Sequence, residues 1–197
     1  MEIVMKNGKA FFSLSVCMLL LVTIVDARAS EGVKPFQLSL FSPVQVQRAD
    51  TDIHGLRINL VHGRNLDVAG LDIGLLNRVD DTMSGFQFGL FNYVNLQVRG
   101  VQEGLFNWVN GNVTGAQAGL ANYTKGDVAG GQFGIFNCSD SLAGVQLGLI
   151  NRAASVSGLQ LGALNITRHL DGLQIGIVNI ATGKESWKVL PILNFNW

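Results

Sequence analysis

The sequence predicts an all-β protein, a repetitive parallel β-solenoid of 14–15-residue coils. The first basis is an eight-residue motif, Gly-apolar-Gln-apolar-Gly-apolar-x-Asn, which recurs eight times between Gly70 and Asn179. The second is its spacing: the second glycine of successive copies advances by 15 residues four times and then by 14 residues three times. The third is the alternation of apolar with small or polar residues inside each copy, which is the period of a half-buried β-strand. A constant repeat length is what stacked coils of equal circumference require.

The chain begins with an expected signal peptide over residues 1–29. Lys6 and Lys9 supply a positive start, an apolar run covers residues 10–25, and Ala27-Arg28-Ala29 offers small residues for cleavage before Ser30. This layout is typical of a secretory signal. The apolar run is shorter than the roughly 20 residues that a spanning helix needs. We therefore expect an exported protein.

The part after the signal is expected to form one domain, with an N-terminal strand and cap over residues 30–54 and the β-repeat domain over residues 55–197. The leader holds three of the 14 basic and two of the 14 acidic residues, so 11 basic and 12 acidic residues remain, a net charge of about −1. No basic stripe appears, which argues against nucleic acid as a partner. Of the two cysteines only Cys138 lies outside the leader, so an intrachain disulfide is not expected.

Each copy is numbered here from its first glycine as position 0. Positions 1, 3 and 5 are mostly Leu, Ile, Val or Phe, and alternation predicts that they form the buried face of a strand. Two features weaken this face: Glu103 occupies position 3 of the third copy, and Ala116 and Ala118 thin out the fourth. A further apolar residue, for example Val98 or Val113, lies two residues before each first glycine.

The Gln at position 2 and the Asn at position 7 are expected to form hydrogen-bonded ladders, because stacked coils place identical side chains about 4.8 Å apart. Two glycines in each strand cost about 0.5–1 kcal/mol each, so close stacking must require them. Asp72 replaces Gln in the first copy and is expected to break the ladder or to mark a capping coil. The predicted ladder residues are Gln87, Gln102, Gln117, Gln132, Gln146, Gln160, Gln174, Asn77, Asn92, Asn107, Asn122, Asn137, Asn151, Asn165 and Asn179.

A closed antiparallel outer-membrane β-barrel is the alternative arrangement, with another all-β fold also open. The segment Val189–Trp197 alternates and ends in an aromatic residue, as barrel C-termini do, and residues 36–41 alternate like a first strand. Against closure, the linkers show no alternation of short turns and long loops. Simple alternation would also turn the eight asparagines toward lipid. In a solenoid, Val189–Trp197 would instead be a last degenerate repeat that caps the stack.

The motif G-[LVF]-Q-x-G-[LI]-x-N at this spacing resembles bacterial surface-exposed repeat proteins of uncharacterised function. The resemblance covers residues 36–197. It implies export to the cell envelope of a bacterium with an outer membrane, and it carries no catalytic residues.

The sequence offers no catalytic, cofactor-binding or metal-ligating set. His54, His62 and His169 lie in different repeats without the spacing of metal ligands. We therefore expect no enzyme activity and no cofactor. Aromatic residues at positions 6 and 8 either pack the turn at the edge of each coil or form a candidate interaction stripe, because amphipathic rings favour interfaces. Its members are Phe91, Tyr93, Phe106, Trp108, Tyr123 and Phe136.

Together these features predict a non-enzymatic exported protein that serves as a surface or periplasmic structural or interaction module. The expected location is the cell envelope, at the outer membrane, the cell surface or the periplasm. Expected partners are the outer membrane, a surface glycan or a surface protein. The alternatives are a small integral outer-membrane barrel for passive transport or anchoring and, more remotely, a secreted carbohydrate-active enzyme.

Overall fold

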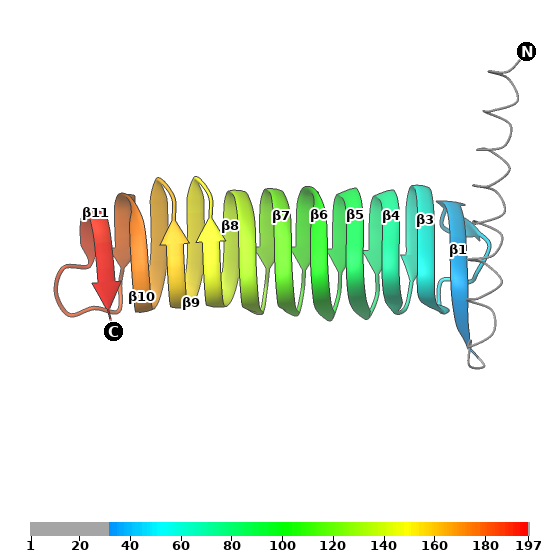
Figure 1. Ribbon diagram of the computed structural model, residues 1–197, viewed down its shortest axis with the longest axis horizontal. Coiled ribbons are helices and arrows are strands. Elements are labelled where there is room, and N and C mark those ends of the chain that lie inside the picture. The colour runs from blue at the N-terminus through cyan, green and yellow to red at the C-terminus, as the bar shows by residue number, and fades with distance from the viewer. Residues whose placement is uncertain (1–31, 197) are drawn as a thin grey trace, which may run out of the picture.

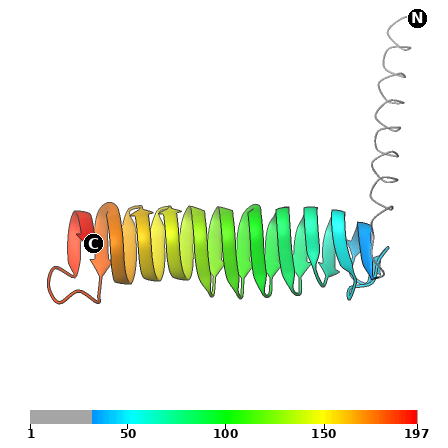
Figure 2. The same cartoon turned by 60° about the horizontal axis from the view of Figure 1, so that its bottom comes forward.

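The protein is a rod of coils stacked side by side, with β1 (Val33–Phe41) at one end and β11 (Val189–Asn196) at the other (Figure 1). This computed structural model describes residues 32–196, so the predicted signal peptide over residues 1–29 lies outside the described residues. Figure 2 shows the same stack after a turn about its long axis, again as a single file of coils. Within residues 32–196, no helix has the length and apolar character needed to cross a membrane.

One sheet of eleven strands winds around the rod, in the order β11-β10-β9-β8-β7-β6-β5-β4-β3-β1-β2. The strands are β1 (Val33–Phe41), β2 (Val44–Gln45), β3 (Asp52–Asn65), β4 (Val68–Val79), β5 (Thr82–Val94), β6 (Gln97–Val109), β7 (Asn112–Thr124), β8 (Asp127–Leu147), β9 (Ile150–Leu161), β10 (Leu164–Ala181) and β11 (Val189–Asn196). In the 15-residue coils the strand is interrupted at a two-residue turn such as Asp80-Asp81. In the 14-residue coils the strand continues through the corresponding turn and is interrupted at the second glycine of the motif, as at Gly148-Leu149.

Neighbouring coils run parallel and pair identical motif positions. Between β5 and β6, for example, Gly85 pairs with Gly100, and Gln87 pairs with Gln102. The same parallel register continues from β3 to β10. The predicted β-solenoid is therefore confirmed, and the alternative arrangement, in which neighbouring copies run antiparallel, is wrong.

The two ends of the rod depart from this pattern. β11 pairs antiparallel with β10, and Asn194 lies opposite Gln174 instead of stacking in parallel on Asn179. The last segment is therefore not a further copy of the repeat in register with the others, because the chain reverses direction between β10 and β11. At the other end β1 pairs parallel with β3, and the short β2 folds back antiparallel against β1.

At positions 1, 2, 3 and 5 the burial of the motif is the reverse of the predicted one. The Gln at position 2 and the Asn at position 7 are buried, while Phe86, Leu90 and Ile73 are 55%, 44% and 43% exposed. Apolar packing inside the rod comes from two other columns, at positions −2 and 9. They comprise Ile53, Val68, Met83, Val98, Val113, Val128, Leu142, Val156 and Leu170 in the first, and Val79, Val94, Val109, Ala153 and Ala181 in the second.

A corner at positions 4 to 6 explains why the Asn at position 7 lies inside together with the Gln at position 2. Positions −2, 2 and 4 face inward on one side of the coil, and then two successive residues such as Leu90 and Phe91 both face solvent. The ladder between β4 and β5 is likewise interrupted between Ile73 and Leu76. Because two neighbours point outward, the parity of the strand changes there, and Asn92 at position 7 points inward. Strict alternation had placed this Asn on the same face as positions 1, 3 and 5.

The first glycine of each copy allows coils to stack at this distance. Gly115 has a φ of +133°, and a Cβ atom there would lie 2.0 Å from the carbonyl oxygen of Gly100 in the coil before it. Both the backbone conformation and the contact exclude a side chain. The cost of glycine in a strand is therefore offset by close stacking, as the sequence predicted.

Candidate interaction surface

The buried glutamines form one continuous hydrogen-bonded ladder. Nε2 of each Gln donates to Oε1 of the Gln in the preceding coil, with distances of 2.7–2.8 Å from Gln174 down to Gln87. At the C-terminal end, Asn194 of β11 donates to Oε1 of Gln174 at 3.2 Å. The antiparallel strand thus supplies the donor that a further Gln would otherwise supply.

The buried asparagines form a second ladder with the opposite polarity. Nδ2 of each Asn donates to Oδ1 of the Asn in the following coil, at 2.8–2.9 Å from Asn77 to Asn179. The second proton of the same amide goes to a backbone carbonyl, as from Asn92 to Glu103 at 2.9 Å. Side-chain amides that are buried in this way need such partners, because an unpaired amide inside a protein is costly.

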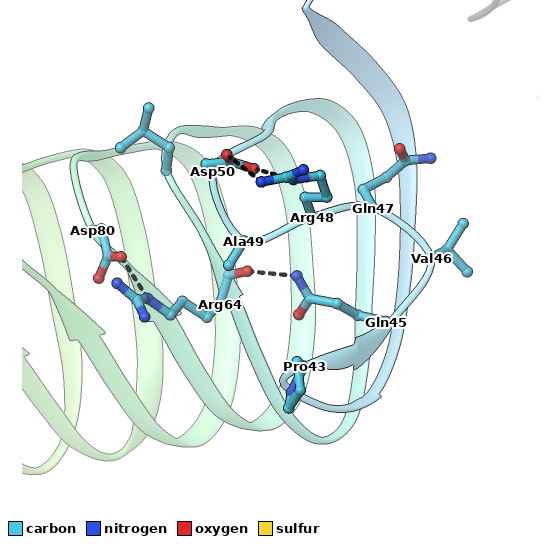
Figure 3. A pocket seen from close by; sticks show the side chains of 10 residues that line it. Pro43, Gln45, Val46, Gln47, Arg48, Ala49, Asp50, Arg64 and Asp80 are labelled. Carbon is cyan, nitrogen blue, oxygen red and sulfur yellow. Dashed lines mark hydrogen bonds and ion pairs between the residues drawn. The ribbon is translucent and has the colours of Figure 1, made fainter.

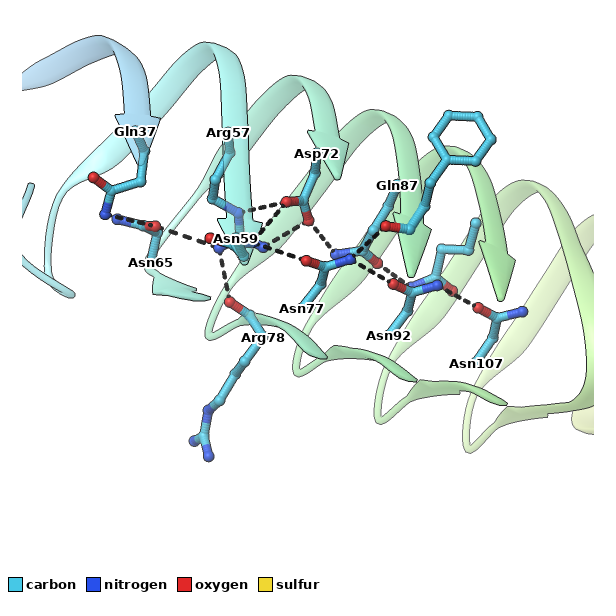
Figure 4. A network of polar contacts seen from close by, with 12 residues as sticks. Gln37, Arg57, Asn59, Asn65, Asp72, Asn77, Arg78, Gln87, Asn92 and Asn107 are labelled. Atoms are coloured by element: carbon cyan, nitrogen blue, oxygen red, sulfur yellow. Dashed lines mark hydrogen bonds and ion pairs between the residues drawn. The ribbon is translucent and has the colours of Figure 1, made fainter. Parts of the chain in front are cut away.

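A buried ion pair ends the Gln ladder near the N-terminus (Figure 4). Gln87 donates to Oδ2 of Asp72 at 2.7 Å, and Arg57 donates to both oxygens of this carboxylate, at 2.7 Å and 2.6 Å. Both side chains are fully buried. Asp72 therefore does not break the ladder but accepts its last hydrogen bond. Arg57 neutralises the charge of Asp72, a role that the motif gave no reason to predict.

The interior is thus filled by packed aliphatic side chains and by amides that are hydrogen-bonded except at Oδ1 of Asn59. Among residues 32–196, no group of three or more His, Cys, Asp or Glu side chains is placed to hold a metal ion. His54 and His169 are exposed, whereas His62 on β3 is partly buried. Burial and then the charges of nearby arginines, Arg78 foremost, lower the pKa of His62, which keeps its imidazole neutral at neutral pH.

A pocket of about 550 Å³ lies where β2 and the segment after it lean on the coils of β3 and β4 (Figure 3). Its charges pair with one another: Arg48 contacts Asp50 at 3.1 Å, and Arg64 contacts Asp80 at 2.6 Å. The charged side chains of this pocket are therefore paired within the protein, and their arrangement does not indicate a particular ligand.

The most regular exposed feature is a corner ridge of apolar side chains at positions 5 and 6, which we call the apolar ridge. It runs along eight successive coils, which corresponds to about 35 Å at 4.8 Å per coil. Leucine, isoleucine and phenylalanine dominate it, and alanine occupies two of its places. Its members are Leu75, Leu76, Leu90, Phe91, Leu105, Phe106, Leu120, Ala121, Ile135, Phe136, Leu149, Ile150, Ala163, Leu164, Ile177 and Val178.

The predicted interaction stripe divides between this ridge and the column beside it. Phe91, Phe106 and Phe136 belong to the ridge and are 49%, 42% and 52% exposed. The other three members, Tyr93, Trp108 and Tyr123, lie at position 8, between the ridge and the polar turns.

Two of the position 8 aromatics, Tyr93 and Trp108, are hydrogen-bonded to the polar turns. The Trp108 indole donates to Asn110 of the turn at 2.9 Å, and the Asn110 amide donates to the Tyr93 hydroxyl at 2.7 Å.

The aromatic rings stack on one another along the rod. The ring centroids of Phe91 and Phe106 lie 4.8 Å apart, and those of Trp108 and Tyr123 lie 4.4 Å apart. Arg78 covers the ring of Tyr93, with its guanidinium carbon 5.3 Å from the centroid. The planes of Phe91 and Phe106 are nearly parallel, at 11°, whereas those of Trp108 and Tyr123 are tilted by 39°.

Comparisons with protein-family models, with curated proteins and with solved structures each found no match. The resemblance to bacterial surface-exposed repeat proteins therefore stays a prediction that rests on the motif alone.

Proposed function

We propose that this protein is a non-enzymatic structural rod of the bacterial cell envelope, and that it engages its partner along the apolar ridge. Export and envelope location are supported by the predicted signal peptide and the motif. The role of the ridge is supported by the arrangement of the coils.

The observation that carries the proposal is the reversed burial of the motif. Polar amides fill the interior, while Leu, Ile and Phe side chains line the outside of successive coils. The ridge is less exposed at Ala121, Ile150, Ala163 and Leu164, which are half-buried. Exposed apolar residues scattered singly are normal, but a large contiguous apolar patch is typical of an interaction site. A rod that worked alone in water would gain nothing from this line of side chains.

The interior supports a structural role. Its amides donate and accept along the two ladders, and its buried charges, Arg57 and Asp72, pair with each other. Such groups hold coils together and are not free to take part in chemistry. We therefore place the function of the protein on its outer surface.

The proposal is tested by cell fractionation of a ridge variant, Leu90→Gln/Leu105→Gln/Leu120→Gln. A matched control, Ser84→Gln/Arg99→Gln/Thr114→Gln, changes outward positions of the same three coils away from the ridge. We expect the wild type and the control to remain with the envelope fraction and the ridge variant to become soluble. Circular dichroism checks that all three proteins keep their strands. Envelope association of a folded ridge variant at the wild-type level would refute the proposal.

A further inference from the structure

We infer that the occupant of the apolar ridge is the surface of a lipid bilayer, on which the rod lies lengthwise. This inference rests on the proposed function and names the partner of the same surface.

The shape of the ridge favours lipid over a second copy of the chain. Two successive residues of each coil, such as Leu90 and Phe91, point outward at a corner, so the ridge is convex. Two residues at about 3.4 Å each across a length of about 35 Å give the ridge itself about 250 Å². The adjoining face at positions 1 and 3, where Ile73 and Phe86 are exposed, brings the whole apolar surface to roughly 600 Å². Each partner in a stable protein interface contributes about 800 Å². Two convex ridges would meet along a line, whereas fluid acyl chains can close around an edge.

The distribution of charge points the same way. Positions 5 and 6 carry no charged side chain from Leu75 to Val178. Tyr and Trp are enriched where a membrane meets water, because one end of each side chain is apolar and the other polar. Long Arg side chains place an apolar stem against lipid and a charge at the headgroups. The bordering column at position 8 has aromatic and basic residues without any acid: Arg78, Tyr93, Trp108, Tyr123, Cys138, Arg152, Ile166 and Ile180.

The charges of this border are partly neutralised within the protein. Arg78 contacts Asp80 at 2.7 Å, and Arg64 of the preceding coil contacts the same carboxylate. Binding should therefore depend on insertion of the apolar ridge more than on attraction to anionic lipid.

One acidic side chain interrupts the apolar surface on the opposite border. Glu103 at position 3 is exposed, whereas its neighbours along the column are Phe88 and Ala118. An ionised carboxylate beside the acyl region opposes insertion, since desolvation of a charge is costly. Removal of this charge should therefore strengthen lipid binding.

A glycan partner fits the surface less well. Sugar rings would need an open aromatic face, and one face of each ring in the stacked pair Phe91–Phe106 and in the tilted pair Trp108–Tyr123 is turned to its neighbour. Aromatic side chains whose polar atoms bond to a polar turn, as those of Trp108 and Tyr93 do, suit the boundary of a bilayer.

The test is flotation of the purified protein, without its signal peptide, on phosphatidylcholine vesicles and on vesicles that also contain phosphatidylglycerol. We expect the wild type to float with both vesicles, with less than a threefold difference between them. The Leu90→Gln/Leu105→Gln/Leu120→Gln variant should lose at least tenfold in binding, and the control variant from the same coils should not. Glu103→Gln should bind at least as well as the wild type.

Two results would overturn the inference and leave the proposed function standing. In the first, the wild type does not float, and light scattering shows a dimer that the ridge variant cannot form. In the second, neither vesicles nor a second copy bind, yet envelope association in cells still depends on the ridge, which would indicate a protein or glycan partner. If the folded ridge variant matches the wild type both in cells and on vesicles, the inference and the proposed function both fail.

Discussion

Arg57 and Asp72 show how single side chains fix the end of a ladder. The glutamine ladder needs an acceptor at its N-terminal end, and the carboxylate of Asp72 accepts from Gln87 there. Its charge would be costly inside the rod without the two hydrogen bonds from Arg57. A buried ion pair of this kind does not have to stabilise the fold more than neutral side chains would.

We therefore expect Asp72→Gln alone to destabilise the protein by about 3–5 kcal/mol, because it leaves the buried Arg57 without its counter-charge. The double variant Arg57→Gln/Asp72→Gln should recover most of this loss, since it extends the glutamine ladder by two members. Urea unfolding followed by circular dichroism measures both effects. A single variant as stable as the wild type, or a double variant no better than the single, would contradict this account of the ladder end.

Asp80 links two strands at the same end of the rod. It accepts hydrogen bonds from Arg64 of β3 at 2.6 Å and from Arg78 of β4 at 2.7 Å. Burial by itself would raise the pKa of Asp80, but the two arginines outweigh it and lower the pKa below its ordinary value of 3.8. Both arginines are about half exposed, so salt should weaken the interaction.

The lowered pKa of Asp80 predicts a pH dependence of stability. Between the folded and the ordinary pKa the unfolded chain binds more protons, so stability rises with pH in that range. The contribution of Asp80 should be complete above its ordinary pKa and disappear as the pH falls through the lower folded pKa. We expect wild type to exceed Asp80→Asn in unfolding free energy at pH 6 and the difference to vanish in acid. A difference that persists unchanged at pH 2 would contradict the ion-pair explanation.

The strands show what the sequence could and could not predict. The stride of 14–15 residues and the Gln and Asn columns predicted parallel coils and both ladders correctly. Hydrophobicity failed to predict which face of positions 1 to 5 points inward, because the interior is filled by hydrogen-bonded amide ladders and not by these apolar side chains. Glu103 was a sign of this, since an acid at position 3 suits solvent better than a core. The corner at Leu90 and Phe91 then changes the parity of the strand and brings Asn92 to the same side as Gln87. The apolar ridge was anticipated only in part: its aromatic members were recognised, but its Leu and Ile residues at position 5 were assigned to the interior.

The antiparallel β11 provides a further prediction, because it covers the end of β10. Asn194 bonds to Gln174, and Lys184 donates to Asn194 at 2.7 Å, which holds the returning strand in place. Removal of residues 189–197 would expose the backbone groups of β10 as an open edge, which favours pairing with other chains. We expect the truncated protein to form end-to-end oligomers in size-exclusion chromatography with light scattering. A truncated protein that stays in the wild-type oligomeric state would show that β11 is not what protects this end.

The rod as a whole should tolerate the loss of one complete coil, because each coil contacts only its neighbours. Deletion of residues 115–129 joins Thr114 to Gly130 and brings Gln132 next to Gln102, so the glutamine ladder continues in register, and the asparagine ladder does the same. We expect a folded protein whose urea m-value falls by about one-tenth, in proportion to the surface that unfolding exposes.

Deletion of only residues 115–121 is the matched control: it shifts every later coil by seven residues, pairs amides with apolar positions and should prevent folding. If both deletions behave alike, stacking of identical positions is not what holds the rod together. The one-coil deletion also removes Ala121 from the ridge and, in the folded rod, places Phe136 beside Phe106. The shortened ridge should therefore keep its binding to vesicles.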